Sequence, residues 1–209
     1  MTKNRNALPG RASILGSALL LAVLGTPVTA QVSLSGTSYT ENFDGIAGGL
    51  PTGWTVRTGA TASALGSNAT YAQATTAWNS SNGNFRNAAS ADGMAGSESS
   101  ATQAASTDRA LAVRQTGSFG DPGAAFVLEI DNTVGLTDFN LTFKLQSLDQ
   151  TTPRTITWRV DYGFGATPTS FTAVTTTPAT ITTGGNAFTN QSVSVNFGNA
   201  LNNQSGPVW

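Results

Sequence analysis

The chain has 209 residues, of which only 10% are charged, and it contains neither histidine nor cysteine. An average soluble domain has roughly 25% charged residues, and the formal net charge of this chain is −1. The two missing residue types exclude a disulfide framework, zinc sites of thiolate or imidazole ligands, and Cys-His or Ser-His-Asp catalysis.

The first thirty residues have the three parts of a secretory signal peptide in the usual order. The apolar run is shorter than the roughly 20 residues that a membrane-spanning helix needs, so we expect export, with cleavage between Ala30 and Gln31. Removal of residues 1–30 takes away three basic residues and no acidic one, which changes the net charge from −1 to −4. The basic start, the apolar run and the small-x-small cleavage triplet are Lys3 to Arg11, residues 14–25 and Val28-Thr29-Ala30.

The remaining chain, residues 31–209, is mildly acidic and poor in lysine. It lacks the basic stripe that nucleic-acid binding requires, and it has no second stretch apolar enough to span a membrane. We therefore expect an exported domain with no nucleic-acid partner and no membrane span.

Residues 59–108 consist mostly of Ala, Ser, Thr, Gly and Asn, with aromatic residues set far apart. Small polar residues bury too little apolar area to order themselves, and fifty residues are too many for a plain loop in a compact domain. The composition predicts a long, partly ordered excursion held by its few aromatic side chains. The alternative is a rim that faces a ligand.

Beyond residue 108, apolar residues recur at every second position, which is typical of strands with one buried and one exposed face. In one of these segments Phe126, Leu128 and Ile130 are predicted to face the core, and Glu129 the solvent. Clusters of Gly, Pro, Asn and Asp between the segments are turn-forming. The predicted strands are residues 109–114, 125–130, 140–145, 155–162 and 192–197.

No segment shows a helical period, so the pattern predicts an all-β fold. We expect one jelly-roll-like antiparallel β-sandwich of about eight strands or more over residues 31–209. An apolar run begins at Pro207-Val208-Trp209, where the sequence stops. We therefore expect that the last strand or strands of the sandwich lie beyond Trp209.

Two stretches resemble known families. Glu41-Asn42-Phe43-Asp44-Gly45, followed by Leu50-Pro51-Thr52-Gly53-Trp54, resembles the opening of the cleaved-adhesin and MAM-like jelly rolls. Residues 84–90, 109–117 and 154–162 resemble uncharacterised secreted proteins of Bacteroidota-type bacteria. That resemblance implies a downstream sorting domain for type IX secretion, which this sequence does not contain.

The resemblance also implies a structural calcium ion. In the adhesin-type jelly rolls, an acidic residue at the position of Glu41 helps to hold calcium, together with an Asp of the last strand, and Asp44 lies close by. Calcium takes six to eight oxygen ligands from carboxylates and carbonyls, which a chain without histidine can supply. The alternative is that Glu41 is a solvated acid at a strand edge and Asp44 a turn residue before Gly45.

Two tryptophans are candidates for stacking on sugar rings, since flat aromatic side chains offer apolar contact. Trp54 precedes the alternating pair Thr55-Val56, which favours a place in the core. Trp78 lies among Asn and Ser residues and is predicted to be the exposed, ligand-binding tryptophan. Trp158 lies on the apolar face of its strand and is expected to be core.

No pair of carboxylates is placed for glycoside hydrolysis, which needs two acids held together. We therefore expect a secreted, non-catalytic accessory or adhesion module that binds carbohydrate, with a glycan or a cell-surface component as its partner. One alternative is the N-terminal module of a secreted hydrolase whose catalytic domain lies beyond Trp209. Another is a structural surface protein. The full open reading frame would discriminate between them, because one fold hosts many functions.

Overall fold

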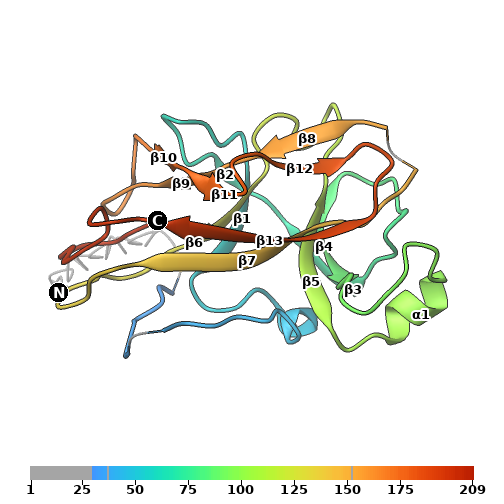
Figure 1. The fold of residues 1–209 in the computed structure, drawn as a ribbon, viewed down its shortest axis with the longest axis horizontal. Helices are drawn as coiled ribbons and strands as arrows, with labels where there is room; N and C mark the ends of the chain where they lie inside the picture. The colour runs from blue at the N-terminus through green and yellow to red at the C-terminus, as the bar shows by residue number, and fades with distance from the viewer. Residues whose placement is uncertain (1–29, 37, 152) are drawn as a thin grey trace, which may run out of the picture.

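The computed structural model describes residues 30–209 except 37 and 152, and it is nearly all β (Figure 1). Most strand pairs are antiparallel, which confirms the predicted all-β, sandwich-like fold. Two short helices occur among the described residues, the 3-10 helix η1 (Ile46–Gly48) and α1 (Ser100–Ala105). The predicted signal peptide lies outside the described residues, except for Ala30.

The two longest strands, β7 (Asn140–Ser147) and β13 (Thr189–Asn196), pair along all eight residues. The short strand β11 (Thr176–Thr177) pairs with the other edge of β13. Val193 and Val195 are buried, whereas their neighbours along β13 are exposed. The period of two in the sequence therefore predicted both long strands and the buried face of β13.

A second group of strands lies beside and behind β7 and β13 in Figure 1. It contains the sheet of β1 (Trp54–Thr58), β2 (Ser67–Asn68) and β6 (Ala125–Leu128), and the pair of β9 (Val160–Tyr162) and β10 (Thr172–Val174). Val208 links the three-stranded sheet to the β9–β10 pair, because it forms β-bridges to Ile130 on one side and to Phe164 on the other. Val208 is only 2% exposed, so this last stretch of the sequence contributes to the core.

The strand β8 (Thr155–Trp158) pairs with β12 (Ile181–Gly184). The Trp158 ring stacks on Phe126 with centroids 5.7 Å apart, which places it against the core as predicted. Gly184 has φ of 89°, and a Cβ atom there would lie 1.9 Å from the carbonyl oxygen of Arg154. Only glycine fits this turn.

The third group stands at the right-hand end of Figure 1, beside α1. It is a three-stranded sheet in the order β3-β4-β5. The pairing of β3 with β4 is parallel, and that of β4 with β5 is antiparallel. Its strands are β3 (Tyr71–Thr75), β4 (Asn84–Ala89) and β5 (Arg109–Arg114).

The prediction of a partly ordered excursion over residues 59–108 is wrong. The segment contains β2, β3, β4 and α1, and β4 is buried from Phe85 to Ala89. Ala88 and Ala89 are small enough to pack closely with Trp78. Arg86 and Asn87 are buried with their polar atoms hydrogen-bonded. The buried residues of this sheet are therefore small side chains and polar side chains whose hydrogen bonds are formed. A prediction that counts apolar residues does not detect them.

The predicted faces of residues 125–130 are also partly wrong. Glu129 is 4% exposed, although it was expected to face solvent, and Val127 on the same face is 9% exposed. This segment lies between neighbours on both edges, since Glu129 receives a main-chain hydrogen bond from Val32 and Ile130 exchanges two with Val208. The Glu129 carboxylate accepts a hydrogen bond from Gln31 Nε2 at 2.5 Å, which helps to compensate its burial.

Across the described ranges, 30–36, 38–151 and 153–209, no helix is both long and apolar enough to cross a membrane.

Candidate functional site

Three aromatic residues gather where the segment before η1 meets the start of β1. Tyr39 is 38% exposed, and its hydroxyl accepts a hydrogen bond from Trp54 Nε1 at 2.9 Å. Phe43 packs edge-on against Trp54, with ring centroids 4.9 Å apart. Trp54 is partly exposed because its strand begins there. We call Tyr39, Phe43 and Trp54 the aromatic patch.

The turn between these aromatic residues is held by polar side chains. Glu41 Oε1 accepts a hydrogen bond from the Phe43 main-chain N–H at 2.7 Å. Phe43 has φ of 63°, a left-handed conformation that costs a bulky residue about 1–3 kcal/mol.

Burial raises the pKa of Tyr39 and the Glu41 carboxylate raises it further, whereas the hydrogen bond from Trp54 lowers it. Tyr39 therefore stays a neutral phenol at ordinary pH.

The predicted calcium ligands lie in this turn, not in a strand. Asp44 Oδ1 accepts a hydrogen bond from the Arg109 main-chain N–H at 3.0 Å, and Asp44 Oδ2 accepts one from Asn42 Nδ2 at 2.7 Å. The side-chain oxygens of Glu41, Asn42 and Asp44 suit calcium in kind. Within the part of the chain that the structure describes, no group of three or more acidic residues is placed to share a metal ion.

Trp78 does not lie where the sequence predicted it. It is 5% exposed and packs against Ala88, Ala89 and Phe188, with the Phe188 ring centroid 5.0 Å away. Its indole N–H donates to the carbonyl oxygen of Ala89 at 2.8 Å. The polar neighbours in sequence belong to a turn, and the indole ring points inward from it. Trp78 is a core residue, and its assignment as an exposed sugar platform is wrong.

A buried arginine organises the polar groups next to Trp78. Arg109, at the start of β5, is 7% exposed, and its Nε donates to Asn87 Oδ1 at 2.7 Å. Its Nη1 donates to the carbonyl oxygens of Gln103 and Ser106, at 3.0 and 3.1 Å. Gln103 in turn accepts a hydrogen bond from the Trp78 main-chain N–H at 2.8 Å. Burial lowers the pKa of Arg109, although the side chain remains cationic.

A pocket of about 370 Å³ opens above this arginine. It lies between the turn that carries Asp44, the end of β3 and the residues that join α1 to β5. The pocket is lined by Asp44, Ala47, Thr75, Asn87, Ser106, Thr107 and Arg109.

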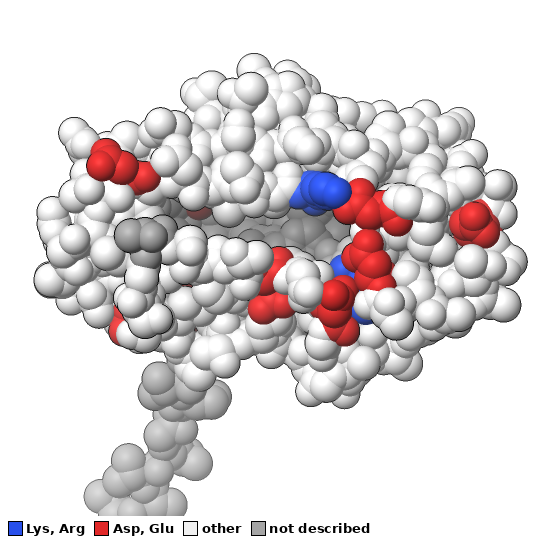
Figure 2. All heavy atoms as spheres, turned by 60° about the horizontal axis from the view of Figure 1, so that its bottom comes forward, with Lys and Arg blue, Asp and Glu red and all other residues white. Residues whose placement is uncertain are grey.

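Figure 2 shows the face that brings the underside of Figure 1 forward. The surface is mostly uncharged and hollowed along its middle, and acidic and basic side chains gather around one end of the hollow. The whole sequence has only 10 basic and 11 acidic residues, so this end of the hollow holds a large share of the few charges of the protein.

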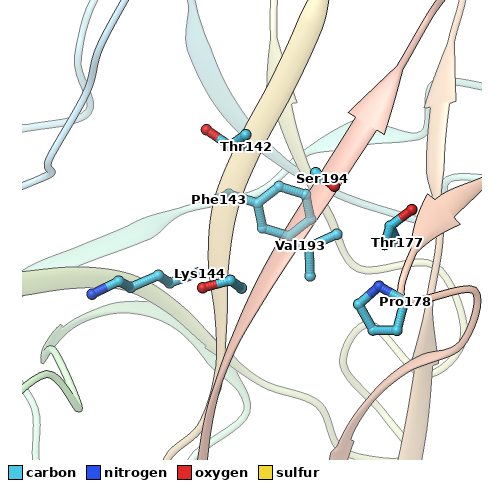
Figure 3. Close-up of a pocket in the computed structure, with 8 residues that line it drawn as sticks. Thr142, Phe143, Lys144, Thr177, Pro178, Val193 and Ser194 are labelled. Carbon is cyan, nitrogen blue, oxygen red and sulfur yellow. The ribbon is translucent and has the colours of Figure 1, made fainter.

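A second groove, of about 620 Å³, crosses β7, β13 and β11 (Figure 3). Its exposed side chains are the hydroxyls of Thr142, Thr177, Ser192 and Ser194 and the ammonium of Lys144. Lys144 forms an ion pair with Asp92, which lowers the pKa of that carboxyl. The aromatic ring among the lining residues, Phe143, is partly buried. The groove can form hydrogen bonds but offers no exposed aromatic surface.

Comparisons with protein-family models, with curated proteins and with solved structures found no match.

Sequence reasoning missed two of the residues that the structure brings forward. Tyr39 lies in a segment without periodicity, although its position close before the Glu41 motif was a usable signal. Arg109 was predicted only as the first residue of the strand at 109–114. Because the chain has so few charges, any of its arginines could have suggested a buried structural cation. That Arg109 is such a cation follows only from the fold, in which it donates to Asn87.

Proposed function

We propose that this chain is a secreted, non-catalytic accessory or adhesion module that binds carbohydrate at the aromatic patch. The observation that supports the proposal is the exposed Tyr39 ring, held in place by the hydrogen bond from Trp54. Aromatic side chains give sugar rings an apolar contact surface at a small cost in conformational entropy. Glu41 and Asn42 lie beside the patch and offer acceptor and donor groups for sugar hydroxyls.

Replacement of Tyr39 by alanine tests this proposal. Loss of the ring removes a stacking surface of some tens of square ångströms, so binding to the best ligand of a glycan array should weaken about tenfold. The melting temperature should change little, because the ring is exposed at the surface. A matched control is Phe164→Ala, since Phe164 is a similarly exposed aromatic residue, at 42%, on another part of the fold. Array binding that is equal in Tyr39→Ala and the unaltered protein would contradict the proposal.

We also propose a calcium ion at Glu41 and Asp44. If the ion binds only the folded protein, a hundredfold excess over its dissociation constant should stabilise the fold by about 2.7 kcal/mol. Glu41→Gln should remove that gain, because it deletes the charge yet keeps an oxygen that can accept from the Phe43 N–H. Thermal unfolding in millimolar calcium and in excess chelator measures the effect, with Glu98→Gln as a control acid. Equal melting temperatures in the two buffers would show that no calcium site exists.

A further inference from the structure

The pocket above Arg109 has a cationic floor. The Arg109 side chain forms no ion pair with a carboxylate among the described residues, although four other basic side chains do. Its Nε and Nη1 donors are engaged at 2.7 to 3.1 Å. The Nη2 group has one longer hydrogen bond, 3.4 Å to the carbonyl oxygen of Asn87. Because Nη2 carries two protons, it retains one N–H for a further acceptor.

The walls of the pocket offer further hydrogen-bonding groups. Thr75 and Thr107 are exposed, and within the described residues neither hydroxyl has a hydrogen-bond partner. Each hydroxyl can both donate and accept. Asp44 adds a carboxylate at the rim, and its oxygens retain lone pairs beyond the two hydrogen bonds that they accept.

The charges of the pocket favour an uncharged ligand. Asp44 and Asp108 both interact electrostatically with Arg109, so the positive charge of the floor is partly balanced. A ligand with its own carboxylate would gain from Arg109 but would be repelled by Asp44. A pair of adjacent hydroxyls satisfies both groups, since one can accept from the guanidinium while the other donates to the carboxylate.

We propose that this pocket binds an uncharged sugar ring, with two neighbouring hydroxyls held between Arg109 Nη2 and Asp44. The proposal rests on the carbohydrate-binding function proposed above and assigns it a second subsite, separate from the aromatic patch. The volume of about 370 Å³ is sufficient for one sugar ring. Thr75 and Thr107 lie on the walls, where they can bond the remaining hydroxyls.

The test is a titration followed by NMR, with the methyl glycosides of glucose, galactose, mannose and fucose as probes and glucuronic acid as the charged comparison. Excess chelator excludes any contribution of calcium. At least one neutral glycoside should shift the Arg109 Nε–H and Thr107 amide signals, and glucuronic acid should bind about tenfold more weakly. Thr107→Val should weaken binding about fivefold, because it removes a hydroxyl that can bond the sugar. Asp44→Asn should weaken binding about tenfold, because it replaces the charged acceptor by a neutral amide.

Thr182→Val is the matched control, since Thr182 is an exposed threonine on β12, away from the pocket lining. The proposal is overturned if no neutral glycoside shifts either signal, or if Thr107→Val and Thr182→Val bind equally. If glycan-array binding depends on Tyr39 while the Arg109 and Thr107 signals stay fixed, the proposed sugar site in the pocket is overturned and the proposal for the aromatic patch stands. Shifts in the pocket without any dependence on Tyr39 would overturn the aromatic patch and support the pocket.

Discussion

Replacement of Phe85 by alanine should lower the free energy of unfolding by about 3–5 kcal/mol. The Phe85 side chain is 0% exposed, and its ring centroid lies 5.6 Å from those of both Phe119 and Phe126. Phe126 stacks in turn on Trp158, so the cavity would open where β4, β6 and β8 meet. Urea denaturation measures the loss as a lower transition midpoint.

The loss could unfold a marginally stable domain, so Phe85→Leu serves as a milder variant with an expected cost of about 1–2 kcal/mol. Phe164→Ala is the surface control and should cost less, about 1 kcal/mol, because the Phe164 ring is 42% exposed and packs edge-on against Tyr162. If Phe85→Ala and Phe164→Ala unfold at the same urea concentration, β4 does not belong to the core. Residues 59–108 would then be the excursion that their composition predicts.

Replacement of Trp78 by alanine should likewise cost about 3–5 kcal/mol, because it empties the space between β4 and Phe188. Trp78→Phe keeps most of the apolar contact but leaves the carbonyl oxygen of Ala89 without its indole donor. A buried acceptor without a partner costs about 1–3 kcal/mol. Both values follow from urea denaturation.

The same Trp78→Phe protein should bind glycans as the unaltered protein does, since the ring is buried. Tyr39→Ala should show the opposite behaviour, with weaker binding and unchanged stability. A Trp78→Phe protein that keeps its stability and loses binding would restore Trp78 as the exposed platform.

The sequence predicted β7, β8 and β13 because each has a period of two. Such strands have one face in the core and one in solvent, and residue type reports that difference directly. The all-β class follows from these strands alone.

Strand β5 was predicted as residues 109–114, but β3 and β4 escaped prediction, because small and polar residues bury the central strand β4 on both faces. Arg86 and Asn87 are charged and polar in the sequence, yet 3% and 1% exposed in the fold. Their hydrogen bonds come from residues up to 22 positions away, which no local pattern encodes. A prediction from composition therefore assigned this segment to the surface.

The candidate site was only partly predictable for a related reason. The motif around Glu41 drew attention to the turn next to the aromatic patch, but the exposure of Trp54 and Trp78 was assigned the wrong way round. Trp54 shares a strand with the buried Val56 but lies at its first residue, where cover is incomplete. Trp78 lies in a turn whose neighbouring residues, Asn79 and Ser80, gave no hint that its ring faces inward.

The most direct test of the proposed binding surface uses the indole N–H signals in a ¹H–¹⁵N NMR spectrum. The sequence has four tryptophans, so four such signals report on four places in the fold. On addition of the best ligand from the glycan array, the Trp54 signal should shift, because its N–H is bonded to Tyr39. The Trp78 signal should stay fixed. A shift of Trp78 without Trp54, or no shift of Trp54 at saturating ligand, would contradict carbohydrate binding at the aromatic patch.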